Sequence, residues 1–276
     1  MFTLNCKGRL LTIDKPMVMG IMNVTPDSFY PGSRKFSVDE ALQTVEKMLT
    51  EGATILDIGG QSTRPHSEQI TETEEADRVL PVIETIIETF PSAFISIDTF
   101  YASVAQQAVY AGASIVNDIS GGLLDDNMLQ TVGVLKVPFV CMHMKGTPAT
   151  MQQLAQYENV TREVLDYFIN RTEACRKAGI SDVIIDPGFG FAKTVSHNFE
   201  LLKNLDVFRM LDKPLLAGIS RKATIYKTLH IPVEEAVNGT TVLNTIALLN
   251  GANILRVHDV KQAMEAIELI EAYKSS

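Results

Sequence analysis

The chain has 276 residues, of which 46% are hydrophobic and 21% are charged, and its formal net charge at pH 7 is −9. The acidic balance argues against generic binding to nucleic acid or to an anionic membrane, since such partners require a basic face, and no apolar run approaches the roughly 20 residues of a membrane helix. The N-terminus lacks a signal-peptide pattern, so we expect a cytoplasmic protein. The three cysteines lack C-x-x-C spacing and the histidines lack H-E-x-x-H spacing, so we expect neither disulfides nor a site for zinc or another transition metal.

The predicted elements begin with a β-hairpin over residues 2–13, which could cap one end of the domain. An apolar run through Met22 predicts the next strand. Ser37 and Glu40 then form a capping-box pattern, which opens a helix that ends near Gly52. From there, strands and helices alternate to the C-terminus. The predicted strands cover residues 54–58, 94–98, 114–117, 137–142, 182–186, 214–217 and 253–257, and the helices cover residues 72–90, 101–111, 125–133, 159–178, 196–211, 234–250 and 260–274.

The strands are nearly continuous apolar runs, which is typical of parallel strands covered on both faces. Right-handed crossovers wind such units into an open sheet or a closed barrel, and eight units favour closure. No linker or low-complexity tract marks a domain boundary. We therefore predict that residues 1–276 form one α/β domain, a single (β/α)8 TIM barrel with an N-terminal hairpin. Residues 143–158 have no helical periodicity and are predicted as a long loop and a candidate lid.

The helix predicted over residues 72–90 opens with Glu72, Glu74, Glu75 and Asp77. Negative charge is favourable at a helix N-terminus because the helix dipole is positive there. We therefore interpret these four side chains as a solvated face.

Each predicted barrel strand ends in a polar or glycine-bearing cluster, the position at which (β/α)8 barrels carry their chemistry. Asp98 ends a strand and also precedes a helix, so capping and catalysis are equal alternatives for it. The same ambiguity holds for Asp57 and for the pair Asn117 and Asp118, one of which is expected to cap or brace a loop.

The segment from Asp186 to Phe191 is more specific. The proline after Asp186 favours extended geometry at that residue, and Gly188 and Gly190 permit a sharp reversal that brings backbone close to a ligand. The segment lacks the third glycine of a dinucleotide fingerprint, and residues 218–222 do not match a P-loop. Nucleotide binding through these motifs is therefore not expected.

Positive charge is concentrated at three strand ends in a chain that is acidic overall. One such residue alone would usually serve solubility. Several on one rim favour a phosphorylated or pyrophosphorylated substrate, because arginine offers forked hydrogen bonds and lysine a point charge. These residues are Arg64, Arg221 with Lys222, and Arg256 with His258.

Six segments combine these features, with the sequences MNVTPDSF (residues 22–29), DIGGQSTRP (57–65), NDISGG (117–122), DPGFGF (186–191), SRK (220–222) and RVHD (256–259). Their order and spacing, over nearly the whole chain, resemble the dihydropteroate synthase family of pterin-binding TIM barrels. The resemblance implies a folate-biosynthesis transferase that joins 6-hydroxymethyl-7,8-dihydropterin pyrophosphate to p-aminobenzoate, giving 7,8-dihydropteroate and pyrophosphate. It also implies a homodimer, Mg²⁺ as cofactor, and competition between sulfonamides and p-aminobenzoate.

The resemblance also implies a role for each matching residue. The catalytic residues would be Asp98, Lys222 and Arg256. The pterin would be bound by Asp98, Asn117, Ile119, Met142, Asp186, Lys222 and Arg256, the last stacking on its face. The pyrophosphate would be held by Asn23, Thr63, Arg64 and His258, with Asn23 binding Mg²⁺. The p-aminobenzoate site would be formed by Phe29, Pro65, Phe191 and Ser220.

Two alternative functions are weighed against this one. A methyltransferase that uses methyltetrahydrofolate and a corrinoid partner shares the barrel and the pterin-reading carboxylates, but it would not need Asn23, Arg64 and His258. A catalytically silent pterin-binding protein would be favoured by loss of Asp98, Lys222 or Asn23, and all three are present.

Overall fold

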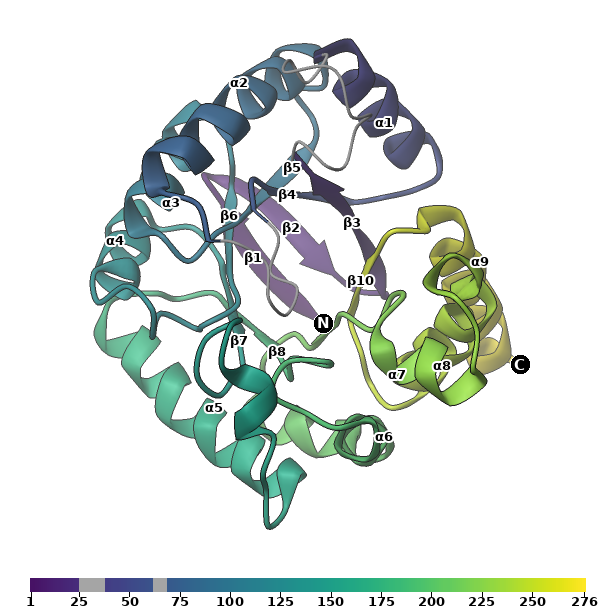
Figure 1. The fold of residues 1–276 in the computed structure, drawn as a ribbon. Helices are drawn as coiled ribbons and strands as arrows, with labels where there is room; N and C mark the ends of the chain where they lie inside the picture. Colours follow the sequence, from purple (N-terminus) through teal and green to yellow (C-terminus); the bar gives the residue numbers. More distant parts are fainter. Residues whose placement is uncertain (25–37, 62–68) are drawn as a thin grey trace.

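The computed structural model describes residues 1–24, 38–61 and 69–276, and in these ranges it has eight parallel strands that curve into a barrel (Figure 1). Each strand pairs with its neighbour in the chain, and the last pairs with the first. Between β8 and β9 the barrel is closed by the bridge Ile185–Leu215 and by a hydrogen bond from Ile185 N to the carbonyl of Pro214. The strands are β3 (Met17–Asn23), β4 (Ile55–Gly59), β5 (Phe94–Asp98), β6 (Ile115–Asp118), β7 (Phe139–Met142), β8 (Val183–Asp186), β9 (Leu216–Ala217) and β10 (Ile254–Val257).

The helices follow one another around the outside of the barrel in chain order (Figure 1). Within the described ranges none of them is long and apolar enough to cross a bilayer. The α-helices are α1 (Val38–Thr50), α2 (Glu72–Thr89), α3 (Ala102–Ala111), α4 (Met128–Leu135), α5 (Val160–Lys177), α6 (Val195–Lys203), α7 (Ala223–Leu229), α8 (Val237–Leu249) and α9 (Val260–Ser275). The 3₁₀ helices are η2 (Met151–Leu154), η3 (Leu205–Leu211) and η4 (Val233–Glu235).

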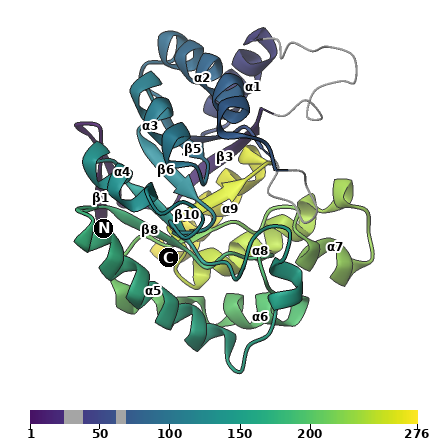
Figure 2. The same ribbon diagram turned by 60° about the vertical axis from the view of Figure 1, so that its left-hand side comes forward.

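The predicted hairpin is confirmed as β1 (Phe2–Cys6) and β2 (Arg9–Ile13), an antiparallel pair at one end of the barrel (Figure 2). Its Leu4, Cys6, Leu11 and Ile13 are buried in one cluster with apolar residues that point into the barrel. The hairpin therefore plugs that end of the barrel. The barrel residues of this cluster are Met17, Met19, Ile55, Ile115, Val140, Ile184, Leu216 and Ile254.

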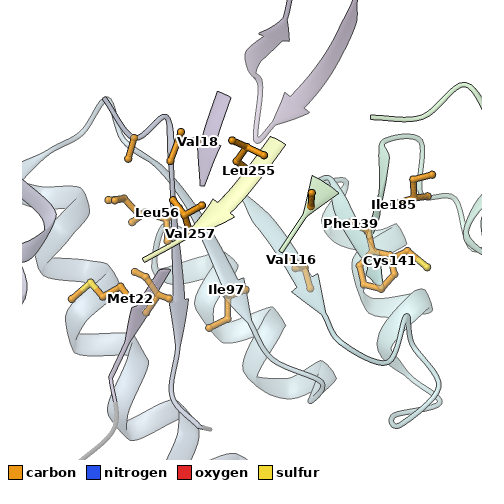
Figure 3. Packing of buried hydrophobic residues seen from close by; sticks show 14 of the residues in the cluster. Val18, Met22, Leu56, Ile97, Val116, Phe139, Cys141, Ile185, Leu255 and Val257 are labelled. Carbon is orange, nitrogen blue, oxygen red and sulfur yellow. The ribbon is translucent and has the colours of Figure 1, made fainter. Parts of the chain in front are cut away.

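The residues that alternate with these inward positions form the second core, between the strands and the helices. Val18, Leu56, Ile97, Val116 and Leu255 belong to it and are fully buried (Figure 3). Both faces of each strand are therefore apolar through most of its length, which explains the continuous apolar runs in the sequence.

The chain departs from the predicted elements in three places. The seven-residue α7 has no counterpart among the predicted elements, since so short a helix has little periodicity to detect. The helix predicted over residues 196–211 is interrupted at Asn204, whose side-chain amide donates to the carbonyl of Glu200 at 2.9 Å and competes with the helical backbone. The predicted loop 143–158 contains η2, whose Met151 is buried. Ser37 lies outside the described residues.

The interpretation of the acidic group on α2 as a solvated face is wrong for Glu75. Glu72, Glu74 and Asp77 are exposed, but Glu75 is fully buried, because it lies one turn before Val79 on the stripe that faces the core. Its carboxylate accepts hydrogen bonds from Thr99 Oγ1 at 2.7 Å and from Gln61 Nε2 at 3.3 Å. Burial raises the pKa of Glu75 to about 7.

Candidate active site

The inward positions of the barrel change from apolar to polar toward the carboxyl ends of the strands. On each of these strands a polar residue stands two positions after an apolar one, and both point into the barrel, because every second residue of a strand faces the same side. A polar layer therefore covers the apolar plug on the side away from the hairpin. The successive inward pairs are Ile55 and Asp57, Phe94 and Ser96, Ile115 and Asn117, Ile184 and Asp186, and Ile254 and Arg256.

Arg256 on β10 bridges two carboxylates of this layer. Its Nε lies 2.6 Å from Asp57 Oδ2, and its Nη2 lies 2.5 Å from Asp98 Oδ2. Asn117 Nδ2 donates to the same oxygen of Asp57 at 3.0 Å. Asp57 is fully buried and the Asp98 side chain is 10% exposed, so the two charges depend on the guanidinium for compensation.

The structure excludes one of the two alternatives for Asp98, the capping of the following helix. Helix α3 begins after Tyr101, which makes no side-chain capping bond, and the backbone N–H of Ala102 is bound by Asp125 Oδ2 at 2.8 Å. Asp98 faces Arg256 instead of capping this helix. Burial raises the pKa of Asp98 to about 7, while Arg256 acts in the opposite direction and Asp57 adds to the rise.

Asn117 and Asp118 point to opposite faces of β6, and only Asn117 enters the polar layer. The Asp118 carboxylate accepts hydrogen bonds from the backbone N–H of Ser120 at 2.7 Å, from Ser120 Oγ at 2.7 Å and from the N–H of Gly122 at 2.6 Å. The expectation that one residue of this pair braces a loop is therefore confirmed, and the brace is Asp118.

Asp186, Lys222 and Arg256 surround Gly218, which follows β9. A Cβ atom at Gly218 would lie 3.7 Å from Asp186 Oδ2, 3.7 Å from Lys222 Nζ and 3.9 Å from Arg256 Cβ. Burial lowers the pKa of Lys222 to about 8, and the nearby Asp186 acts against this fall. Burial also raises the pKa of Asp186, against the effect of Lys222. Asp186, Lys222 and Arg256 therefore converge on Gly218, within van der Waals contact of where its Cβ would be.

Lys222 also contacts the loop that follows β8. Its Nζ donates a hydrogen bond to the carbonyl of Phe189 and lies 4.7 Å from the centre of the Phe191 ring, within the range of a cation–π interaction. Phe191 packs in turn against a small apolar cluster that contains Ile119 and Met142. This cluster forms an apolar wall beside the charged residues.

A second polar group joins the ends of β9 and β10. Ser220 Oγ lies 3.0 Å from His258 Nδ1 and accepts from the His258 N–H at 3.2 Å. Arg221, predicted as part of a cationic rim, is held by Asp259 in a forked pair with distances of 2.9 and 2.7 Å. Its charge is therefore compensated within the protein, and the pair fastens the two loops together.

The remaining predicted site residues are only partly described. Asn23 is the last residue of β3, on the inward face and half-buried, and it pairs in register with Gly59. Phe29, Thr63, Arg64 and Pro65 lie outside the described residues. In the described ranges, His, Cys, Asp and Glu form no group of three or more that could hold a metal ion.

Sequence reasoning left Asp57 out of the candidate site, although it lies at the centre of the ion-pair network. The signal was present: Asp57 follows the inward Ile55 by two residues, as Asp186 follows Ile184. Lys193 and His143 were also missed. Both are buried, at 4% and 3% exposure, and they lie 2.9 Å apart between two loops of the barrel mouth.

Comparison with known proteins gives consistent matches. The profile of the family described as "Pterin binding enzyme" matches residues 19–258. The dihydropteroate synthase of Haemophilus influenzae is 44% identical over 271 residues, covering 98% of each chain. The solved structure of the Yersinia pestis dihydropteroate synthase with a sulfonamide drug aligns with a TM-score of 0.94 and 39% identity over all of both chains. The Xanthomonas albilineans dihydropteroate synthase in complex with 7,8-dihydropteroate aligns with a TM-score of 0.89 and 38% identity, also over all of both chains.

Proposed function

The chain belongs to the dihydropteroate synthases, a family of pterin-binding enzymes, and from this premise we propose how the residues of the barrel mouth act. The enzyme is a transferase that condenses 6-hydroxymethyl-7,8-dihydropterin pyrophosphate with p-aminobenzoate to give 7,8-dihydropteroate and pyrophosphate. The similarity over the full chain to dihydropteroate synthases favours this function over a corrinoid-linked methyltransferase and over a catalytically silent protein.

The pterin is proposed to bind in the polar layer, against Asp98, Asn117, Asp186, Lys222 and Arg256. The observation that carries this proposal is the convergence of Asp186, Lys222 and Arg256 around Gly218, which has no side chain of its own. A pterin edge presents both hydrogen-bond donors and acceptors, which carboxylates, an amide and a lysine satisfy in complementary fashion. A ring without those groups would leave buried charges unpaired, so the site discriminates strongly against it. Ile119 and Met142 would supply the apolar wall.

The proposed mechanism follows from the charges around the ring. The C–O bond to pyrophosphate breaks and its electron pair leaves with the pyrophosphate, so positive charge develops on the methylene and the ring. Asp98, which is buried and already oriented by Arg256, stabilises that positive charge. The amine nitrogen of p-aminobenzoate then forms the new C–N bond and loses a proton. Because the electrophile is activated by bond breaking, no side-chain nucleophile is needed.

Mg²⁺ is proposed as the cofactor, with Asn23 as its protein ligand. Protein-bound Mg²⁺ commonly keeps several waters and takes one or two protein ligands together with substrate phosphates. The amide oxygen of Asn23, at a half-buried strand end, fits this pattern. The described ranges contain no acidic cluster, and a site built mainly from water and phosphate oxygens does not require one. When bound, the ion would neutralise charge on the leaving pyrophosphate. His258, which Ser220 orients, and Thr63 and Arg64 in the undescribed segment are proposed to hold the pyrophosphate.

The p-aminobenzoate site is proposed to lie over Phe191 and Ser220, with Phe29 and Pro65 contributed by the segments outside the described residues. Phe191 offers a ring face beside Lys222, and Ser220 is fixed by His258. Sulfonamides would compete for this position.

The proposal of a magnesium-dependent synthase is tested by following pyrophosphate release. We expect release only when both substrates and Mg²⁺ are present, because the arylamine consumes the activated pterin and the ion neutralises the leaving group. Reactions without p-aminobenzoate, or with EDTA in place of Mg²⁺, serve as controls. Release no faster than in a reaction without enzyme would refute the assignment, and full activity in EDTA would refute the role of the metal.

A homodimer is proposed, formed through the face made by α6, η3, α7, η4 and α8. This face carries a group of exposed apolar side chains, and α7 contacts both α6 and α8. A contiguous apolar patch is typical of a protein interface. Its residues, with exposures from 36% to 69%, are Phe199, Val207, Met210, Leu229, Val233, Val242, Ile246 and Leu249.

The dimer is tested by light scattering during size-exclusion chromatography. Wild-type protein should elute at about twice the chain mass of 30.4 kDa, and Val242→Asp with Ile246→Asp should elute as a monomer. The control is Leu269→Asp on α9, where the leucine is 72% exposed outside the patch. A monomeric wild type, or a double variant that stays dimeric, would contradict the proposal.

The cytoplasm is the proposed location of the enzyme. Cys6, Cys141 and Cys175 are all free and buried, which suits a reducing compartment.

We also propose that residues 1–276 form one domain. This is supported by the apolar cluster that the hairpin shares with the interior of the barrel.

A further inference from the structure

Lys193 is a buried cation without an evident place in the proposed mechanism. It lies in the loop between β8 and α6 and is 4% exposed. Its Nζ lies 2.9 Å from His143 Nδ1 and donates to the carbonyls of Phe191 at 3.0 Å and Gly188 at 3.1 Å. The carbonyl of His143 lies a further 3.4 Å away. An ammonium group has three protons to donate, so these acceptors satisfy it without solvent.

The contacts of Lys193 are costly enough to require an explanation. Among the described residues, its partners are carbonyl oxygens and an imidazole, with no carboxylate in ion-pair contact. Burial lowers the pKa of Lys193 well below its ordinary value, with Asp186 acting in the opposite direction, and burial likewise lowers the pKa of His143. The desolvation is offset by hydrogen bonds to His143 and to loop carbonyls, so Lys193 exchanges the cost of its own burial for fixed positions of those groups.

The groups that Lys193 holds belong to two loops of the barrel mouth. His143 follows β7, whereas Gly188 and Phe191 follow β8. The loops are in direct contact at Gly188, whose φ is +71° and where a Cβ atom would overlap the carbonyl of His143. The ammonium collects carbonyls from both loops and so fixes one against the other.

The loop after β8 is also the loop that contacts Lys222. The Phe189 carbonyl and the Phe191 ring both contact the Lys222 ammonium. Lys193 binds the carbonyls of Gly188, just before Phe189, and of Phe191, two residues after it. Lys193 therefore controls where Phe189 and Phe191 meet Lys222, although it is not itself among the residues proposed to touch substrate.

We propose that Lys193 is a positioning residue, which holds the loop after β8 so that Phe191 forms the p-aminobenzoate side of the active site. The inference rests on the proposed role of Phe191. The ion-pair network of Arg256, Asp57, Asp98 and Asn117 comes from other strands and makes no hydrogen bond or ion pair with Lys193. Of the proposed pterin residues, Asp186 and Lys222 contact the loop after β8, at the N–H of Gly188 and the carbonyl of Phe189, and not Lys193 itself. Loss of Lys193 should consequently affect the use of p-aminobenzoate more than that of the pterin.

The first test compares Lys193→Met, which keeps the length of the chain but removes the charge, with Lys203→Met on the exposed surface of α6. Lys193→Met should raise KM for p-aminobenzoate about tenfold, the scale of one lost charge-assisted contact, and leave KM for the pterin substrate within about threefold. Lys203→Met should match the wild type. Equal changes in both KM values, or wild-type kinetics in Lys193→Met, would overturn the proposal.

A double-mutant cycle tests whether Lys193 acts through Phe191. In a Phe191→Leu background the effect of Lys193→Met on KM for p-aminobenzoate should be much smaller than in the wild type, because the ring to be positioned is missing. Fully additive effects would overturn the inference. If Lys193→Met does not fold, Lys193→Arg takes its place in both tests, since it keeps the charge but not the compact ammonium geometry.

Hydrogen exchange separates failure of this inference from failure of the proposed function. Amides of residues 188–191 should exchange faster in Lys193→Met than in the wild type, while those of residues 115–118 should not change. This measurement needs no activity. An inactive wild type would refute the function alone, whereas unchanged exchange at residues 188–191 would refute the positioning role alone.

Discussion

Asp98→Asn should lower kcat/KM by at least about 100-fold, the scale of one preorganised electrostatic contact in an active site. Asparagine has nearly the same shape as aspartate, so the change removes a charge and leaves the volume in place. The lost charge serves two purposes in the proposed mechanism. It orients Arg256, from 2.5 Å, and it stabilises the positive charge that develops on the pterin as pyrophosphate leaves.

Lys222→Ala should have an effect of the same size, about 100-fold or more. Its ammonium lies beside Gly218 and is also the group to which Phe189 and Phe191 are directed. Both variants are measured by pyrophosphate release with saturating p-aminobenzoate. Asp126→Asn, an exposed residue in the loop before α4, is the matched control for Asp98→Asn and should retain the wild-type rate. Near-normal turnover in Asp98→Asn or Lys222→Ala would show that the role of that residue is misassigned.

The position of the polar layer follows from local rules. Strands alternate their faces, so an inward Ile55 fixes an inward Asp57, and the same step leads from Ile184 to Asp186. The same rule separates Asn117 from Asp118. Ile115 faces the barrel interior, so Asn117 must also face it and Asp118 must face the loop. Alternation alone places Asn117 and Asp118 on opposite faces, but both faces of these strands are apolar, so the structure is needed to show which face is inward.

Other features depend on closure of the barrel and were not accessible from the sequence. Asp57 and Arg256 are 199 residues apart, and they meet only because β10 returns to pair with β3. Glu75 lies on the core-facing stripe of its helix, but the hydrogen-bond partners that satisfy its buried carboxylate, Gln61 and Thr99, come from two other segments. The burial of Lys193 likewise depends on a distant segment, since its acceptor His143 is 50 residues away. Local sequence patterns identify single polar residues, but contacts between distant segments decide which of them become buried and charged.

Arg256→Met should lower the free energy of unfolding by about 3–5 kcal/mol at pH 8, the cost of leaving buried charge unpaired. Methionine fills much of the space of the arginine stem, but Asp57 and Asp98 lose the guanidinium that they share. The control is Arg162→Met on α5, whose side chain is 80% exposed, and it should change stability by less than about 0.5 kcal/mol. Urea unfolding measures both variants.

The destabilisation in Arg256→Met should decrease as the pH falls from 8 to 5. Arg256 lowers the pKa of Asp98, so its removal must raise that pKa above the value of about 7 found with the arginine present. Below the raised pKa the folded variant binds a proton that the unfolded chain, with an ordinary carboxyl pKa, does not yet bind, and stability is regained. Adding Asp57→Asn should recover part of the loss at pH 8, because it removes one of the two unpaired charges. An equal loss at pH 8 and pH 5 would mean that lost packing, and not unpaired charge, is the dominant cost, and that Arg256 does not lower the pKa of Asp98.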